Sequence, residues 1–150
     1  MRKIIFTKQG FADLIEEKHR LEEIRVATVK DLQKAREMGD LSENGFYKAT
    51  KSRLGQIDHR LFEIDILTKR ADISEKQSSN FISIGSEVEL ELNGQTIKYF
   101  IVGDTEANLT ENKISSHSPL GSALINKKVG DLAKVKLPQY SAIYKILAIK

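Results

Sequence analysis

Residues 47–71 read YKATKSRLGQIDHRLFEIDILTKRA, and their apolar side chains return at alternating intervals of three and four positions. A seven-residue template set on Tyr47 separates two rows, of which six of the eight positions are apolar when Tyr and Ala are counted. The sequence therefore predicts a helix that packs lengthwise on another helix, as in a coiled coil. The rows are Tyr47, Leu54, Leu61 and Thr68, and Thr50, Ile57, Ile64 and Ala71.

A second helix is expected upstream, from about Gly10 to Met38, although its apolar stripe is less regular. Lys18, Arg25 and Thr28 interrupt the face where apolar residues belong. We therefore expect this helix to pair with one specific partner rather than to form an ideal zipper. The apolar positions of its face are Leu14, Leu21, Leu32 and Ala35.

The two helices are separated by residues 38–44, MGDLSEN, a break too short to do anything but reverse the chain. Gly39 is placed to end the first helix in the left-handed conformation, and Asp40 with Glu43 has the spacing of a capping box for the second. The sequence thus predicts an antiparallel hairpin with about 28 residues per arm, a rod roughly 40 Å long. A two-helix rod offers no concave pocket for an enzyme active site.

The composition changes after a polar segment at residues 74–80, which we interpret as a linker. We predict a helical hairpin over residues 1–75 and a small β domain over residues 76–150. Strands are expected at residues 86–92 and 95–102 around Asn93-Gly94, a strong hairpin signal.

Further along, Ser118 is placed to cap a short helix, and two more strands are expected at residues 134–137 and 142–149. The predicted fold class is α+β, with a helical hairpin followed by a small antiparallel sheet and one short helix.

Composition excludes several classes of function. The chain has no cysteine, so thiolate metal sites and thiol nucleophiles are excluded, and a metal would have to be held by oxygen. Twenty-four basic against twenty-one acidic residues give a net charge of +3, so phosphate binding would have to be local. The sequence contains neither a membrane span nor a signal peptide, so we expect no membrane partner.

Asp40 and Glu43 are the residues that call for a chemical interpretation, because the hairpin presents both carboxylates at its far end. Such oxygen ligands suit Mg²⁺, which usually takes one or two carboxylates and keeps several waters. Two carboxylates alone make an incomplete site. The alternative interpretation is that both residues only cap a helix.

The surrounding string, AREMGDLSENGFYKA at residues 35–49, closely resembles the signature of the bacterial Gre transcript cleavage factors, on the GreA side of that family. A second block, from Ile101 to Asp131, resembles the C-terminal signature of the family, and it includes SPLGSAL at residues 118–124. The residues that fit its N-terminal pattern are Thr7, Gly10, Leu14 and Leu21. The resemblance covers nearly the whole chain.

This resemblance implies a coiled coil that enters the secondary channel of bacterial RNA polymerase and an FKBP-like domain that docks at the channel mouth. It implies that Asp40 and Glu43 help to hold the second Mg²⁺ of the polymerase site and so stimulate cleavage of the nascent RNA 3′ end in backtracked complexes. The chain itself would not be an enzyme. We expect a cytoplasmic monomer that binds no Mg²⁺ tightly when isolated.

Three further tip residues match the motif, and each has two interpretations. Ser42 and Asn44 would position water or substrate, or they would serve turn and cap geometry. Tyr47 would stack on a nucleotide, or it would pack in the helical seam.

Lys48, Lys51 and Arg53 follow the tip and are candidates for contact with RNA phosphates, although a solvated basic helix face explains them nearly as well. Phe46 departs from the family pattern, because many relatives carry an acidic residue at this position. A third carboxylate is therefore absent, which affects the expected support for the metal.

Two other functions are compatible with the sequence, and a third is disfavoured. The chain would be a channel-binding regulator or inhibitor that does not stimulate cleavage, or a protein-binding coiled coil whose tip acids are structural. A prolyl isomerase is disfavoured, because the sequence has no Trp and shows no aromatic-lined proline pocket. Docking predicts an exposed apolar patch on the C-terminal domain, which the sequence does not place. Capping and turn geometry account for Ser115, Ser118, Pro119 and Gly121 of the signature.

Overall fold

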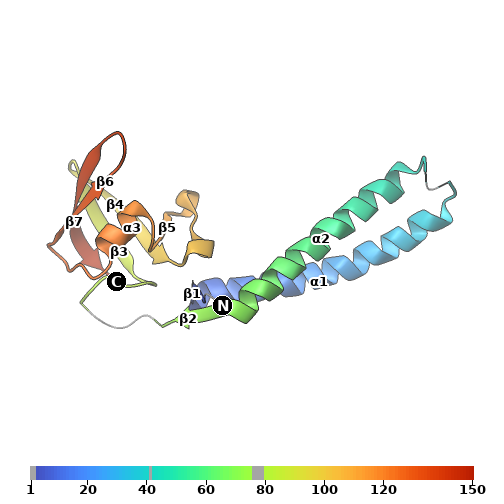
Figure 1. Cartoon of the computed structure of the whole chain (residues 1–150), viewed down its shortest axis with the longest axis horizontal. Coiled ribbons are helices and arrows are strands. Elements are labelled where there is room, and N and C mark those ends of the chain that lie inside the picture. Colours follow the sequence, from blue (N-terminus) through green and yellow to red (C-terminus); the bar gives the residue numbers. More distant parts are fainter. Residues whose placement is uncertain (1–2, 41, 76–79) are drawn as a thin grey trace. The chain divides into compact units, whose positions relative to one another are not determined.

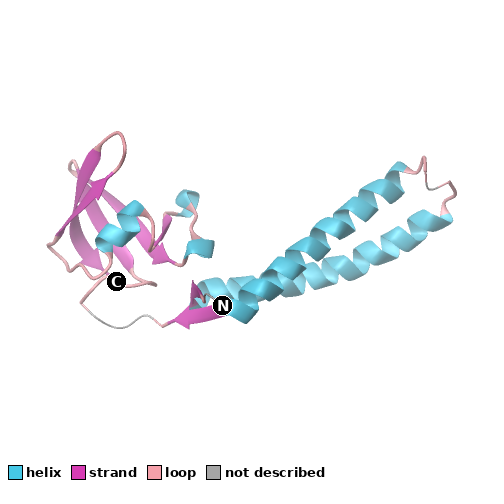
Figure 2. Ribbon diagram, in the orientation of Figure 1, coloured by secondary structure: helices cyan, strands magenta, loops and turns pink. Residues whose placement is uncertain are grey.

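The structure is a computed structural model that describes residues 3–40, 42–75 and 80–150. Two long helices form a hairpin, and a curled five-stranded sheet with a short helix follows (Figures 1 and 2). The predicted fold class is therefore confirmed. None of the helices in the described ranges is long and apolar enough to cross a membrane.

The hairpin consists of α1 (Lys8–Glu37) and α2 (Gly45–Arg70). The predicted row of Thr50, Ile57 and Ile64 is buried on α2, and the companion row at residues 47, 54, 61 and 68 is half-buried. The two-row seam is therefore confirmed, except that Ala71 lies beyond the helix in a strand. On α1 the buried residues are Leu14, Thr28, Leu32 and Ala35.

Two residues that interrupt the stripe of α1 pair with acids on α2. Lys18 Nζ lies 2.8 Å from Asp65 Oδ1, and Arg25 Nε lies 2.6 Å from Asp58 Oδ1. These pairs explain the specific partnership that the sequence predicts, because each fixes one point of the helix register. Thr28, the third interruption, is buried with its hydroxyl donating to the Ile24 carbonyl at 2.8 Å.

A further ion pair strengthens the hairpin from its flank. Arg60 of α2 donates from Nε and Nη2 to the two carboxylate oxygens of Glu17, at 2.7 and 2.9 Å. This bidentate geometry is the strongest form of an arginine–carboxylate contact. It lowers the pKa of Glu17, chiefly through the hydrogen bond from Arg60.

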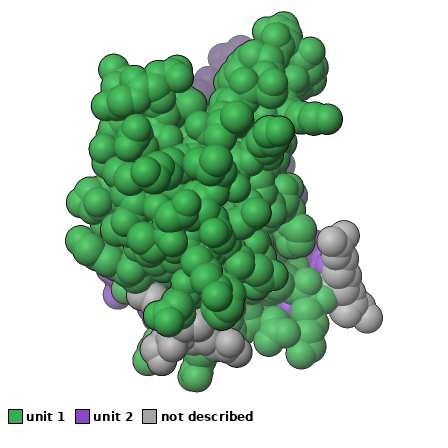
Figure 3. Space-filling model, turned by 90° about the vertical axis from the view of Figure 1, so that its left-hand side faces the viewer, with its two compact units in different colours: residues 1–11, 71–150 green, residues 12–70 purple. Residues whose placement is uncertain are grey.

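Contacts divide the chain into two compact units (Figure 3). Unit 1 comprises Met1–Phe11 and Ala71–Lys150, and unit 2 comprises Ala12–Arg70. The predicted sequence boundary at residues 75 and 76 stays a prediction, and most of the predicted linker at residues 74–80 lies outside the described residues. The short strands that flank the hairpin, β1 (Ile4–Thr7) and β2 (Ala71–Ser74), were not expected, and they pair in parallel.

The five-stranded sheet of unit 1 has the order β5-β4-β3-β7-β6. The predicted Asn93-Gly94 turn joins β3 to β4, with both residues at positive φ. Three pairings are antiparallel as predicted, but β5 runs parallel to β4, so the sheet is mixed. The strands are β3 (Glu87–Leu92), β4 (Gln95–Val102), β5 (Lys113–Ser115), β6 (Leu132–Lys136) and β7 (Ser141–Ile149).

The sheet packs around an aliphatic core that includes α3 (Pro119–Leu124). Ser118 caps α3 by accepting from the Gly121 amide at 3.0 Å, as predicted. Gly121 is required there, because a Cβ would lie 2.0 Å from the Ser115 carbonyl oxygen. The buried core residues are Ile82, Val88, Leu90, Ile101, Ile114, Leu124, Ala133 and Ile146.

Within unit 1, Glu106 at the end of the 3-10 turn η1 (Asp104–Glu106) contacts the first turn of α1. Its carboxylate accepts from the Thr7 amide at 2.8 Å and from the Thr7 hydroxyl. Thr7 in turn caps α1 by accepting from the Gly10 amide at 2.9 Å. A carboxylate at a helix N-terminus also complements the helix dipole.

Candidate functional site

The tip of the hairpin is built by Gly39 and Asn44. Gly39 has φ +108°, which ends α1 in the conformation predicted for it. The Asn44 side chain accepts from the Tyr47 amide at 3.0 Å, and so caps α2. Its amide also donates to the Ala35 carbonyl at 3.0 Å, so this one side chain closes both helices of the hairpin.

The predicted capping box of Asp40 and Glu43 is wrong. Asp40 instead accepts from the Ser42 amide at 2.9 Å and from the Ser42 hydroxyl at 2.7 Å, which makes a local turn. Glu43 is exposed and makes no hydrogen bond or ion pair within the described part of the chain. Since Asn44 has taken the capping position, neither carboxylate is used to start α2.

Both tip carboxylates are accessible to a ligand. The Ser42 hydroxyl, followed by the Ser42 amide, lowers the pKa of Asp40 from its ordinary value of 3.8, which already leaves the carboxyl ionised at neutral pH. No group of three or more Asp, Glu or His residues that could hold a metal exists in the described ranges. The donor set fits part of a Mg²⁺ site and lacks the ligands to complete one.

Ser42, Asn44 and Tyr47 all have structural contacts. Ser42 donates to Asp40, Asn44 caps α2, and Tyr47 is half-buried in the seam. Their predicted role in positioning water or substrate stays a prediction.

The structure separates the three basic residues that follow the tip. Lys48, Lys51 and Arg53 are all exposed on α2. At about 100° per residue, Lys48 and Lys51 lie within about 60° of each other, whereas Arg53 lies about 140° from Lys48. The lysines therefore share one flank, and Arg53 lies on the opposite flank. Their contact with RNA phosphates stays a prediction.

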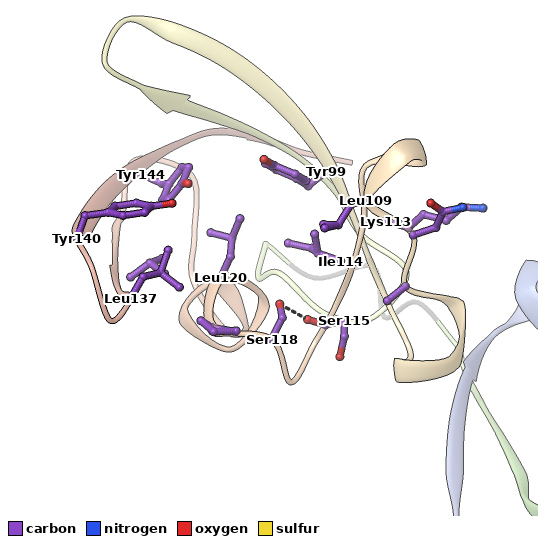
Figure 4. A pocket seen from close by; sticks show the side chains of 14 residues that line it. Tyr99, Leu109, Lys113, Ile114, Ser115, Ser118, Leu120, Leu137, Tyr140 and Tyr144 are labelled. Carbon is purple, nitrogen blue, oxygen red and sulfur yellow. Dashed lines mark hydrogen bonds between the residues drawn. The ribbon is translucent and has the colours of Figure 1, made fainter.

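A second candidate site is an apolar pocket of about 510 Å³ in unit 1. Tyr99, Tyr140 and Tyr144 line one side of it (Figure 4). An aromatic-lined cavity is thus present where the sequence showed none. Its aliphatic lining includes Leu109, Ile114, Pro119, Leu120, Val135 and Leu137.

Two residues of this pocket differ in their exposure. Leu109, in the 3-10 turn η2 (Leu109–Glu111), is 80% exposed at its edge. Tyr144 is partly buried, and burial raises its pKa above 10.0. Ser115, Ser118 and Pro119 of the C-terminal signature also border the cavity, in addition to the turn and capping roles predicted for them.

Comparisons with known proteins match both halves of the chain. Residues 4–73 match the family "Transcription elongation factor, N-terminal", and residues 77–150 match "Transcription elongation factor, GreA/GreB, C-term". The transcription elongation factor GreA of Thermotoga maritima is 35% identical over 153 residues, which cover 99% of this chain and 98% of the relative.

Two other proteins give similar coverage. The transcription elongation factor GreA of Rhodospirillum rubrum is 37% identical over 155 residues, which cover 100% of this chain and 99% of the relative. The solved structure of GreA factor homolog 1 (Gfh1) of Thermus thermophilus is 31% identical, covers 99% of both chains and has a TM-score of 0.48.

Proposed function

The chain belongs to the GreA/GreB family of transcription elongation factors, and from this premise we propose that it stimulates RNA polymerase to cleave backtracked RNA. The hairpin is the part that enters the secondary channel of the polymerase, and its tip acts at the 3′ end of the nascent RNA. Bond cleavage belongs to the polymerase, and this chain supplies groups to its active site.

The observation that carries this proposal is the exposure of the Asp40 and Glu43 carboxylates and their absence from the cap of α2. Both carboxylates are exposed at the end of the rod, and Asn44 rather than either acid caps α2. A purely structural explanation of the two acids has therefore lost its main support. Exposed carboxylates that are not needed to cap a helix are suited to bind a ligand supplied by a partner.

The ligand that fits is a Mg²⁺ ion shared with the polymerase, because Asp40 and Glu43 provide only part of an oxygen donor set. When bound, such an ion stabilises the attacking and leaving oxygens of phosphodiester hydrolysis. The chain contributes negative charge held in place. Ser42 orients the Asp40 carboxylate and lowers its pKa through two hydrogen bonds, while Glu43 makes no hydrogen bond within the described residues.

The apolar pocket supports a separate role for the C-terminal domain in docking. The function requires a surface that holds the factor on the polymerase, and an exposed apolar patch is the expected form of such a surface. The pocket combines three tyrosines, a residue type enriched at protein interfaces, with the exposed apolar side chain of Leu109. We assign polymerase docking to this pocket.

The test is RNA cleavage in stalled, backtracked elongation complexes with Mg²⁺, in which wild type is compared with Asp40→Asn and Glu43→Gln. We expect each variant to bind the polymerase normally and to lower cleavage by about 10- to 100-fold, the range seen when groups that support a metal are altered. Glu23→Gln, which neutralises an exposed acid in the middle of α1, is the matched control and should cleave like wild type.

Two outcomes would overturn the proposal. If wild type binds the polymerase without stimulating cleavage, the chain is a channel-binding regulator. If both tip variants cleave like wild type, the acids have no part in the chemistry.

A further inference from the structure

Phe46 is a large apolar side chain exposed beside the tip carboxylates. It is the second residue of α2, and 51% of its surface is exposed. The neighbouring Tyr47 and Thr50 face the helical seam, so Phe46 lies on the flank of the hairpin. An aromatic ring that faces water forgoes the stabilisation that burial would give it.

The flank of Phe46 continues along α2 at intervals of seven residues, through Arg53 and Arg60. The two arginines of this row differ in their partners. Arg60 contacts Glu17 at 2.7 Å and Glu63 at 3.1 Å. Arg53 is exposed and has no ion pair within the described residues.

The antiparallel arrangement of the helices explains the difference. One heptad from Arg60 toward the tip is Arg53, and one heptad from Glu17 toward the tip on α1 is Ile24. The acid that neutralises Arg60 therefore has no counterpart opposite Arg53. The guanidinium of Arg53 is available to an external anion.

An exposed aromatic ring and an exposed cation on one row are the two components of a site for single-stranded nucleic acid. Bases stack on aromatic rings, and arginine binds phosphate in bidentate geometry. Seven residues of helix separate Phe46 from Arg53 by about 10.5 Å along the axis, a gap that the long arginine side chain shortens.

We propose that Phe46 and Arg53 form a nucleotide-binding strip on which a base of the extruded RNA stacks against Phe46 while its phosphate backbone contacts Arg53. This inference rests on the proposed function, because it requires the tip to meet the RNA 3′ end. The charges favour this order of contacts, with the base near the tip and the phosphate further back. Asp40 and Glu43 repel phosphates at the tip, whereas Arg53 attracts them further back on the hairpin.

The experiment uses two backtracked complexes that differ only in the extruded 3′ nucleotide, which either carries its base or is abasic. Phe46→Ala should raise the factor concentration needed for half-maximal cleavage about tenfold with the normal nucleotide, the size of one base–aromatic stack, and should leave it unchanged with the abasic one. Phe46→Trp should behave like wild type on both substrates.

Arg53→Gln should raise the factor concentration needed for half-maximal cleavage to a similar extent with both substrates, because phosphate is present in each. Phe62→Ala is the matched control, since Phe62 is also exposed on α2, at 64%, but lies outside the row. This control should leave the factor concentration for half-maximal cleavage unchanged with both substrates.

A direct contact is measured in the same complexes by photocrosslinking from 4-thiouridine at the RNA 3′ end. We expect crosslinks in residues 46–53 that Asp40→Asn retains although it no longer stimulates cleavage. Loss of cleavage with retained crosslinks would therefore separate the strip from the tip chemistry. Equal effects of Phe46→Ala on the two substrates, no effect on either, or crosslinks absent from residues 46–53 would overturn the proposed strip.

Discussion

The hairpin and the sheet domain differ in what holds them together and in what they expose to a partner. The hairpin has a single narrow seam, so charged pairs such as Arg60–Glu17 reinforce its register, and it presents carboxylates at a convex tip. The sheet domain closes around an aliphatic core and presents an apolar cavity. Under the proposed function, this difference places chemistry and docking in separate units, so that one can be altered without the other.

The largest effect is expected from a charge placed at the edge of the pocket. Leu109→Asp should weaken binding to RNA polymerase by at least tenfold, because a charge at an apolar contact loses its hydration without a partner. Affinity is measured by competition with labelled wild type. Leu132→Asp, a change at a 58% exposed residue outside the pocket lining, is the control and should bind normally.

Failure of this prediction would remove the proposed division of roles between the hairpin and the sheet domain. Normal binding by Leu109→Asp would mean that the pocket is not the docking surface.

A smaller effect is expected in the flank of the hairpin. Arg60→Glu should destabilise the chain by about 1 kcal/mol, and the exchange with Glu17→Arg should restore part of this loss. Denaturation in urea followed by helical circular dichroism measures the coupling. A coupling of zero in the double-mutant cycle would show that the seam alone fixes the register.

The pH dependence of this coupling has a defined sign. Arg60 lowers the pKa of Glu17 below its ordinary value of 4.5. The stabilisation is therefore fully present above pH 4.5 and is lost as the pH falls through the lowered pKa. At about pH 2 we expect the cycle to show little coupling.

The smallest effect concerns the tip itself. Ser42→Ala removes the hydroxyl donor to Asp40, so the pKa of Asp40 should rise toward its ordinary value of 3.8 while the backbone amide of residue 42 still holds it partly down. Carboxyl NMR titration of the isolated chain measures this change. Ser52→Ala, at an exposed serine of α2, is the control. An unchanged pKa in Ser42→Ala would remove Ser42 from the positioning of Asp40.

The sequence predicts the hairpin well because its signals are local. Heptad spacing identifies the seam, and Gly39 marks the end of α1. The cap of α2 was misassigned, because Asp40 and Asn44 are both good capping residues and the choice between them depends on the three-dimensional path of the turn. The tip acids were thus identified correctly as candidates, but their contacts were not.

The sheet domain shows where local signals end. The strands around Asn93-Gly94 were predicted, since alternation and the turn agree. β1, β2 and β5 were missed, because strands of three or four residues carry almost no periodicity and pair with distant segments. The pocket was missed for a similar reason, as Tyr99 and Tyr144 come from strands that only the fold brings together.

The parallel pairing of β1 with β2 makes the hairpin a segment that protein engineering can exchange or lengthen. β1 leads directly into α1, and β2 directly follows α2, so the hairpin leaves and rejoins unit 1 through adjacent strands about 4.8 Å apart. The hairpin beyond the first turn of α1 can therefore be exchanged as one segment with junctions at residues 11/12 and 70/71, which leaves the contact between that turn and Glu106 in unit 1. Exchanging it, or lengthening both arms by a whole heptad, would move the tip by about 10.5 Å steps without altering the host domain.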